Sequence, residues 1–377
     1  MCNLSEIHLN QLDPLDLAQQ KQAFEAGALS VAALLHYRFV DERYRISREF
    51  DPIVGVSFTG LFDFFVKAFG AGWLRWWEAG RQDDWNGVTL TEVKQLWNIG
   101  KALGVDDDDD VFMDSDAGLF ENLEQRYLKY WRECVRAKLY DYCDKHELKK
   151  PNRYTTVQPS GTKSLLTGAS AGWHPPKAQR YIRRITFTKN DPVALACVDY
   201  GYSVIPSQSD KDEEGNLLND PFDPRVTEWL VEIPVEVPWA NIPGADKIDI
   251  NQFSAEAQFK FWMQVQKHYT LHNSSATIEL REHEIEPLAN LIHDAIQNDE
   301  GYISCALLAR FDANNTFPRL PFEPISKERY EELQQQMLSR RKSNDFHSLL
   351  EAYDKGWNKD QGVVGCDSDK CMMPEAK

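Results

Sequence analysis

The stretch Thr155-Thr156-Val157-Gln158-Pro159-Ser160-Gly161-Thr162-Lys163-Ser164 marks the point where the character of the chain changes. A strand-like run ends at a proline, and hydroxyl side chains then gather around one glycine. Binding of a phosphate needs several hydrogen-bond donors at short range, which hydroxyls and consecutive backbone N–H groups supply. The glycine lets the backbone approach closely. The stretch predicts a phosphate-binding loop, with an ordinary Ser/Thr/Gly turn as the alternative.

Upstream of this stretch the pattern is mainly helical. Thr89 is expected to be a helix N-cap, because Glu92 follows three residues later, as in a capping box. Gly55–Gly60 is expected to form a glycine-punctuated turn into an aromatic segment. The expected helices are Leu15–Tyr37, Thr89–Leu103 and Ala117–Leu148.

Downstream, short strand-like runs alternate with helical patterns, which is typical of an α/β architecture with strands buried from both sides. The strand-like runs are Tyr154–Val157, Tyr181–Phe187, Trp229–Val237, Ala276–Leu280 and Ile303–Leu308, and the helical patterns are Glu256–Tyr269, Glu284–Ile296 and Lys327–Arg341. The apolar periodicity stops near Lys355. We therefore expect a mainly helical part (1–150), an α/β part that carries the loop (151–354) and a mobile tail (355–377).

The composition restricts the class of function. The 377 residues carry a net charge of −17, and a surface this acidic repels duplex DNA and anionic membranes. No apolar run approaches the roughly 20 residues that span a bilayer. The N-terminal segment Met1–Glu6 has neither the basic start nor the apolar stretch of a signal peptide. We expect a cytoplasmic protein without stable nucleic-acid or membrane binding.

Seven cysteines in such a chain indicate redox chemistry or metal binding and not a disulfide framework. Cys366 and Cys371 lie close together near the C-terminal end, where a dithiol can close a disulfide loop and reopen it. This spacing suits a carrier of electrons between a buried site and an external reductant. Two free surface cysteines are the alternative, which the acidic residues between them favour. Cys2 by itself carries no signal.

We expect no metal site. A structural zinc ion needs four ligands, and neither a second cysteine pair nor a histidine pair lies near Cys366 and Cys371. The run Asp106–Asp110 lacks the alternating spacing and the glycine of a calcium loop, so it is expected to be a solvated loop. The cysteines at 134, 143, 197 and 305 lie in helical or apolar patterns and are expected to be packed thiols.

Several segments, taken together and in order, resemble the class II ribonucleotide reductases of the monomeric, triphosphate-reducing, adenosylcobalamin-dependent type. They cover nearly the whole chain, and it is their order that makes the resemblance specific. The segments are Cys2–Glu6, Gly55–Gly60, Pro159–Thr162, Gly172–Pro175, Tyr181–Ile185, His272–Glu279 and the Cys366/Cys371 pair.

The resemblance implies a fold, a reaction and a role for each matched residue. The fold is the second half of a ten-stranded α/β barrel, and the reaction is reduction of ribonucleotides, as triphosphates, with adenosylcobalamin as cofactor. Cys2 matches one of two active-site thiols that reduce the ribose and become a disulfide. Cys366 and Cys371 match the pair that re-reduces this disulfide and is restored by thioredoxin or a similar dithiol. The residues that match the substrate-phosphate loop are Pro159, Ser160, Gly161, Thr162 and Ser164.

The chain departs from the family pattern in one respect. The segment Asn-Pro-Cys-x-Glu, which supplies the thiyl radical and stands upstream of the residue matching Cys2, is not found in this sequence. We therefore expect the chain to work with a separate N-terminal chain, as the product of a split or interrupted gene. The alternatives are a catalytically inactive fragment that binds nucleotide phosphates and an unrelated zinc protein that uses the tail cysteines.

Overall fold

The computed structural model describes residues 2–105, 115–310, 318–353, 365–367 and 370–372. The chain divides into two compact units. Unit 1 comprises Met1–Gln179 and Val237–Asp312, and unit 2 comprises Arg180–Glu236 and Ala313–Lys377. These limits differ from the boundaries expected at 150/151 and 354/355. The expected division, by sequence pattern and role, stays a prediction. The expected loop at Asp106–Asp110 lies outside the described residues.

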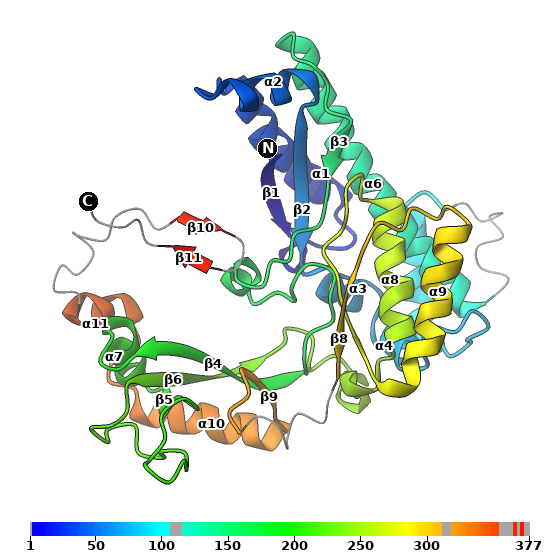
Figure 1. Cartoon of the computed structure of the whole chain (residues 1–377). Coiled ribbons are helices and arrows are strands. Elements are labelled where there is room, and N and C mark those ends of the chain that lie inside the picture. The colour runs from blue at the N-terminus through cyan, green and yellow to red at the C-terminus, as the bar shows by residue number, and fades with distance from the viewer. Residues whose placement is uncertain (1, 106–114, 311–317, 354–364, 368–369, 373–377) are drawn as a thin grey trace. The chain divides into compact units, whose positions relative to one another are not determined.

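Unit 1 contains a parallel three-stranded sheet (Figure 1). Its order is β1 (Cys2–His8), β2 (Ile53–Thr59) and β3 (Arg153–Thr155), with Cys2 opposite Ile53 and His8 opposite Thr59. The predicted turn at Gly55–Gly60 is therefore wrong. The β-branched residues around Gly55 favour a strand, and β2 is buried on both faces, as central strands of parallel sheets are. Within Gly55–Gly60, only Gly60 adopts a left-handed conformation, with φ of 75°.

After β3 in the sequence, parallel pairing recurs only as short, separate pairs among the described residues. Val157 forms a single parallel bridge to Ser274, and β7 (Thr277–Leu280) then pairs in parallel with β8 (Ala306–Ala309). The described residues thus form small separate sheets, and the predicted half of a ten-stranded barrel is not confirmed. One physical reason is the prolines at 151 and 159, which flank β3 and limit its length.

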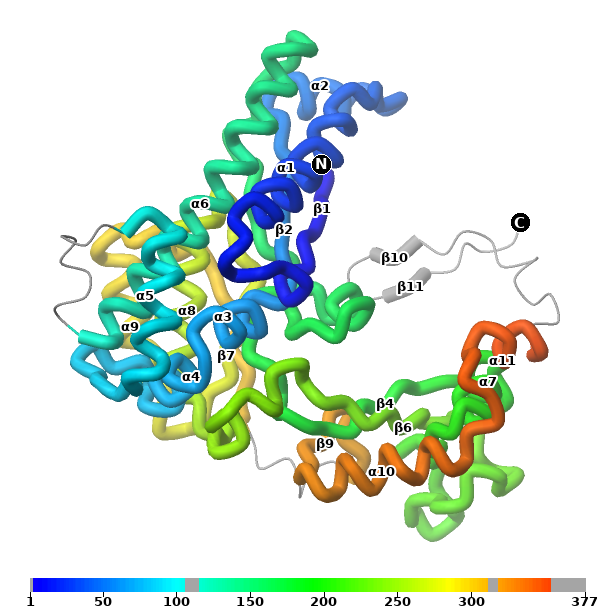
Figure 2. Tube along the Cα trace, turned by 180° about the vertical axis from the view of Figure 1, so that it is seen from behind, coloured from blue at the N-terminus to red at the C-terminus, as the bar shows by residue number. Residues whose placement is uncertain are grey.

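Helices cover this sheet and enclose an aromatic core. Helix α1 lies against β1 and β2, and α6 packs beside it (Figure 2). Phe24 of α1 stacks on Trp131 of α6, with 5.2 Å between ring centroids. The helices of unit 1 are α1 (Leu17–Ala33), α2 (Glu42–Phe50), α3 (Leu61–Phe69), α4 (Ala71–Glu78), α5 (Leu90–Ala102), α6 (Asp116–Lys145), α8 (Ala255–His268) and α9 (Ile285–Gln297). Short 3-10 helices are η1 (Leu9–Gln11), η2 (Leu34–His36), η4 (Lys163–Thr167), η5 (Ala245–Lys247), η6 (Ile250–Gln252) and η7 (Glu282–Glu284).

Unit 2 is built on an antiparallel sheet with the order β5-β6-β4-β9. Its inner face packs on a small core that includes Trp229, Val231 and Cys197, whereas many residues of β4 stay partly exposed. The expectation of strands buried from both sides is wrong here, because an antiparallel sheet commonly leaves one face to solvent. The elements are β4 (Arg180–Thr188), α7 (Pro192–Asp199), β5 (Ser203–Pro206), β6 (Glu228–Glu236), β9 (Phe322–Pro324), α10 (Lys327–Arg340), α11 (Phe346–Tyr353), β10 (Gly365–Asp367) and β11 (Lys370–Met372).

Most predicted helices are confirmed to within a few residues. Thr89 caps α5, and its hydroxyl and the Glu92 carboxylate form the expected capping box. Within the described part of the chain, no helix combines the length and the apolar character that crossing a bilayer requires.

Candidate phosphate-binding site

The loop predicted from the hydroxyl and glycine pattern folds as a tight turn followed by the 3-10 helix η4. Ser160 has a left-handed backbone, with φ of 54°, and its carbonyl oxygen accepts a hydrogen bond from Ser164 N at 3.1 Å. Gly168, with φ of 66°, ends η4. The turn therefore brings residues 160 to 164 close together, and phosphate binding by them stays a prediction.

Two parallel strands hold this loop at their carboxyl ends. Gln158 N donates to Ser57 Oγ of β2 at 2.9 Å. His8 at the end of β1 contacts Thr167 Oγ1 through Nδ1 at 2.7 Å, and Asn10 Nδ2 donates to the Thr167 carbonyl at 2.9 Å. Ligands of open α/β sheets bind outside the carboxyl ends of the strands. The loop thus stands where such sheets place a binding site.

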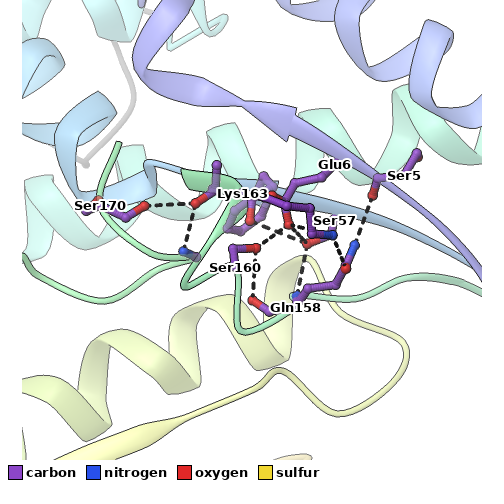
Figure 3. Close-up of polar contacts among 10 residues, drawn as sticks. Ser5, Glu6, Ser57, Gln158, Ser160, Lys163 and Ser170 are labelled. Atoms are coloured by element: carbon purple, nitrogen blue, oxygen red, sulfur yellow. Dashed lines mark hydrogen bonds and ion pairs between the residues drawn. The ribbon is translucent and has the colours of Figure 1, made fainter. Parts of the chain in front are cut away.

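Glu6 of β1 reaches into the loop, a contact that the sequence reasoning missed (Figure 3). Its Oε2 accepts a hydrogen bond from the Ser160 hydroxyl, and the Lys163 ammonium lies 3.8 Å away. Glu6 belongs to a segment that carried the family resemblance, but no local pattern distinguished it. No sequence signal could have found this contact, because it joins residues 154 positions apart.

The five predicted phosphate-binding residues differ in exposure. Ser160 and Ser164 are 5% and 2% exposed, so their hydroxyls lie within the protein. Pro159, Gly161 and Thr162 are exposed, and a Cβ atom added to Gly161 would meet no atom within 4 Å. The accessible face of the loop therefore consists of Pro159, the backbone near Gly161 and the side chains of Thr162 and Lys163.

A buried carboxylate, Asp63, holds the segment that follows the loop. Asp63 of α3 accepts hydrogen bonds from Ser170 N at 2.6 Å and from Trp239 Nε1 at 2.8 Å. Burial raises the pKa of Asp63, and these two hydrogen bonds oppose the rise. Thr59 Oγ1 also joins the segment to β2, because it donates to the Ser170 carbonyl at 2.8 Å. These contacts fix the chain that follows the loop.

The predicted redox cysteines lie in both units. Cys2 begins β1, opposite Ile53, and lies four residues before Glu6, which corresponds to about 13 Å along a strand. Cys366 and Cys371 stand opposite each other in the antiparallel pair β10 and β11. The side chains of these three cysteines lie outside the described residues, so their catalytic roles stay predictions.

The other four cysteines are free thiols. Cys134, Cys143 and Cys197 are buried and Cys305 is half-buried, and burial raises the pKa of each thiol. A raised pKa disfavours the reactive thiolate, which agrees with the predicted packing role. Among the side chains that the structure describes, no three His, Cys, Asp or Glu groups converge as metal ligands.

No protein-family model matches the chain, but curated proteins do. The adenosylcobalamin-dependent ribonucleoside-triphosphate reductase of Lactobacillus gasseri is 25% identical over 336 residues, which cover 88% of this chain and 38% of that protein. The protein of the same name from Euglena gracilis is 26% identical over 250 residues, which cover 65% of this chain and 30% of that protein.

The fold matches a solved structure as well. A crystal structure of a B12-dependent, class II ribonucleotide reductase superposes with a TM-score of 0.66 at 20% sequence identity, covering 94% of this chain and 42% of that one. The chain thus spans less than half the length of the proteins it resembles. The chain is therefore similar to part of the adenosylcobalamin-dependent ribonucleoside-triphosphate reductases, the family that the ordered motifs resemble.

Proposed function

We propose that the chain takes part in the reduction of ribonucleoside triphosphates to deoxyribonucleotides, as the portion that holds the substrate phosphates and supplies reducing thiols. The observation that carries the proposal is the loop Pro159–Ser164, which is tied to the carboxyl ends of β1 and β2. Strand β1 is also the strand that begins with Cys2. One strand therefore joins the anion-binding loop to the proposed reducing thiol.

The proposed redox step is thiol–disulfide exchange. Cys2 and a second thiol, from a part of the enzyme beyond this chain, lose two electrons to the ribose and become a disulfide. Cys366 and Cys371 then reduce that disulfide and are themselves oxidised to a disulfide, which thioredoxin or a similar dithiol reduces. The register that sets Cys366 opposite Cys371 supports this role, because cross-strand neighbours have Cα separations of about 4.5–5.5 Å, within disulfide range.

Adenosylcobalamin, the cofactor named for the relatives, would supply the initiating radical. We assign it no residue.

We propose that a separate N-terminal polypeptide completes the enzyme. Two observations support it: the relatives are more than twice as long as the matched region, and β1 and β8 each lie at an edge of a described sheet. On β8, Leu307 and Leu308 are about half exposed, at 52% and 50%. An exposed apolar edge strand is a template for pairing with another strand.

Mixing this chain with a reductase polypeptide that contains Asn-Pro-Cys-x-Glu tests the proposal. We expect deoxyribonucleotide formation from ribonucleoside triphosphates in the presence of adenosylcobalamin and a dithiol, and none from either chain alone. Thr162→Val, which removes the exposed hydroxyl of the loop, should raise KM for the triphosphate. A complex that binds nucleotide and forms no product would favour the inactive phosphate-binding fragment instead.

A further inference from the structure

The Glu6 carboxylate accepts a hydrogen bond from Ser160 of the phosphate loop and lies 3.8 Å from the Lys163 ammonium, which itself donates to Gln158 Oε1. We infer that the Glu6 carboxylate competes with the phosphate of an arriving nucleotide for the donors of this loop, so that Glu6 limits the affinity of the site. The inference rests on the proposed function, since it assumes that the loop binds phosphate. It assigns to Glu6 a regulatory role at the site, distinct from that of a phosphate ligand.

The contacts of Glu6 are those of an anion in an anion site. Its Oε2 accepts from the Ser160 hydroxyl, lies 3.5 Å from the Ser57 hydroxyl and 3.8 Å from Lys163 Nζ. Two hydroxyls and an ammonium group around one oxygen form the kind of donor set that a phosphate oxygen also uses. Figure 3 shows Ser57, Ser160 and Lys163 directed toward this carboxylate.

The second oxygen of Glu6 is the independent sign that this arrangement is incomplete. The Glu6 side chain is only 5% exposed, and its Oε1 is buried without a hydrogen-bond partner among the described residues. A buried charged oxygen without a donor is unfavourable. The loop thus provides enough donors for one oxygen of the carboxylate and leaves the other unsatisfied.

The two sides of the contact differ in their freedom to move. Glu6 is held in β1, where it stands opposite Ser57 of β2. Ser160 and Lys163 lie in the loop, and the Lys163 side chain is 50% exposed. When a phosphate binds at the accessible face, Lys163 and the Ser160 hydroxyl can turn to it, whereas Glu6 stays in the strand. The Glu6 charge then repels the bound phosphate, because like charges at short range inside a protein interact strongly.

Replacement of Glu6 by glutamine tests this inference, because glutamine keeps the shape and removes the charge. The probe is inorganic triphosphate, titrated into the full chain by calorimetry at low salt and neutral pH. We expect Glu6→Gln to bind about tenfold more tightly than the original chain, a change of about 1.4 kcal/mol. Glu6→Asp keeps the charge and should bind within about twofold of the original chain, well inside 1.4 kcal/mol.

Glu25→Gln is the matched control. Glu25 is a carboxylate of α1 that pairs with Lys21 on the surface, and its replacement should leave triphosphate affinity unchanged. Circular dichroism spectra that match the original chain show that each variant is folded. If Glu6→Gln binds more weakly than the original chain, or equally well, Glu6 does not compete for the donors of the site, and the phosphate-binding loop still stands. If neither chain binds triphosphate, the inference and the proposed function both fail.

Discussion

At the scale of single residues, His174 is a structural side chain with a defined protonation state. Its Nδ1 donates to the Ala171 carbonyl at 3.0 Å, and its Nε2 accepts from Thr277 N at 3.0 Å. This pair of bonds requires the neutral ring, and burial lowers the pKa of His174 to about 4. The ring thus joins the segment after the phosphate loop to β7.

This lowered pKa predicts a loss of stability in weak acid. Between about pH 6.5 and pH 4 the unfolded chain takes up a proton that folded His174 does not, so the free energy of unfolding falls as pH falls through this window. We expect a loss of about 2–3 kcal/mol from this residue. Urea unfolding at a series of pH values measures it, and His174→Asn should flatten the dependence. The pKa of His268 is also lowered to about 4, so part of the pH dependence of the free energy of unfolding should remain in this variant.

A second residue-scale prediction concerns the ion pair between Arg81 and Glu124. Both side chains are fully buried and bonded in parallel at 2.8 Å, and the guanidinium lies 3.8 Å from the Trp76 ring. Glu124→Gln leaves a buried cation without its counter-charge, which should cost about 3–5 kcal/mol of stability. Arg136→Ala, which removes an exposed partner of Glu133, should leave the unfolding midpoint nearly unchanged. Similar losses of stability in both variants would contradict the role of the buried Arg81–Glu124 pair.

At the scale of elements, the contact between Gly201 and α10 sets how closely this helix packs in unit 2. Gly201 has φ of 101°, and a Cβ atom added there would lie 2.0 Å from the Met337 carbonyl oxygen. Only glycine permits both the backbone conformation and this approach. The close packing of the turn after α7 against the end of α10 therefore requires glycine at position 201.

Gly201→Ala should therefore displace α10 and cost about 2–4 kcal/mol, as incompatible glycine substitutions do. Hydrogen exchange should show faster amide exchange in α10 and β6, with unit 1 unaffected. Gly215→Ala is the control, since φ there is also positive, at 86°, but no atom lies within 4 Å of the added Cβ. Equal effects at both glycines would mean that backbone strain alone, without the contact to α10, explains the result.

At the scale of the whole molecule, the proposed mechanism needs thiols from distant parts of the sequence, Cys2 at one end and the Cys366/Cys371 pair at the other. We expect the double variant Cys366→Ser/Cys371→Ser to lose multiple turnovers with a protein dithiol reductant in the completed enzyme, and to keep a single turnover from the pre-reduced active site. Product counted per enzyme molecule with thioredoxin measures this. Unchanged turnover with thioredoxin would exclude the tail pair from electron transfer.

Much of the candidate site was predictable, because its signals are local. The hydroxyl and glycine pattern of Pro159–Ser164 predicts a tight turn, and this turn is present. Glu6 was not predictable, because its contact with Ser160 joins residues 154 positions apart. Strand β2 was misread because a glycine and a serine between β-branched residues are typical of a turn in isolation and of a tightly packed strand in a sheet.

The sequence by itself determined the features that depend on neighbours along the chain: the helix limits, the capping box of Thr89 and Glu92, and the ordered motifs that relate the chain to the reductases. Only the tertiary structure decided which strands pair and which charge faces the loop. The physical reason is that helices and turns are closed by bonds between residues a few positions apart, whereas a sheet and a binding site are closed by bonds between distant segments. The register of β1 and β2 sets Glu6 opposite Ser57, beside the loop that carries Ser160. A shift of this register by one residue would turn Glu6 to the other face of the sheet.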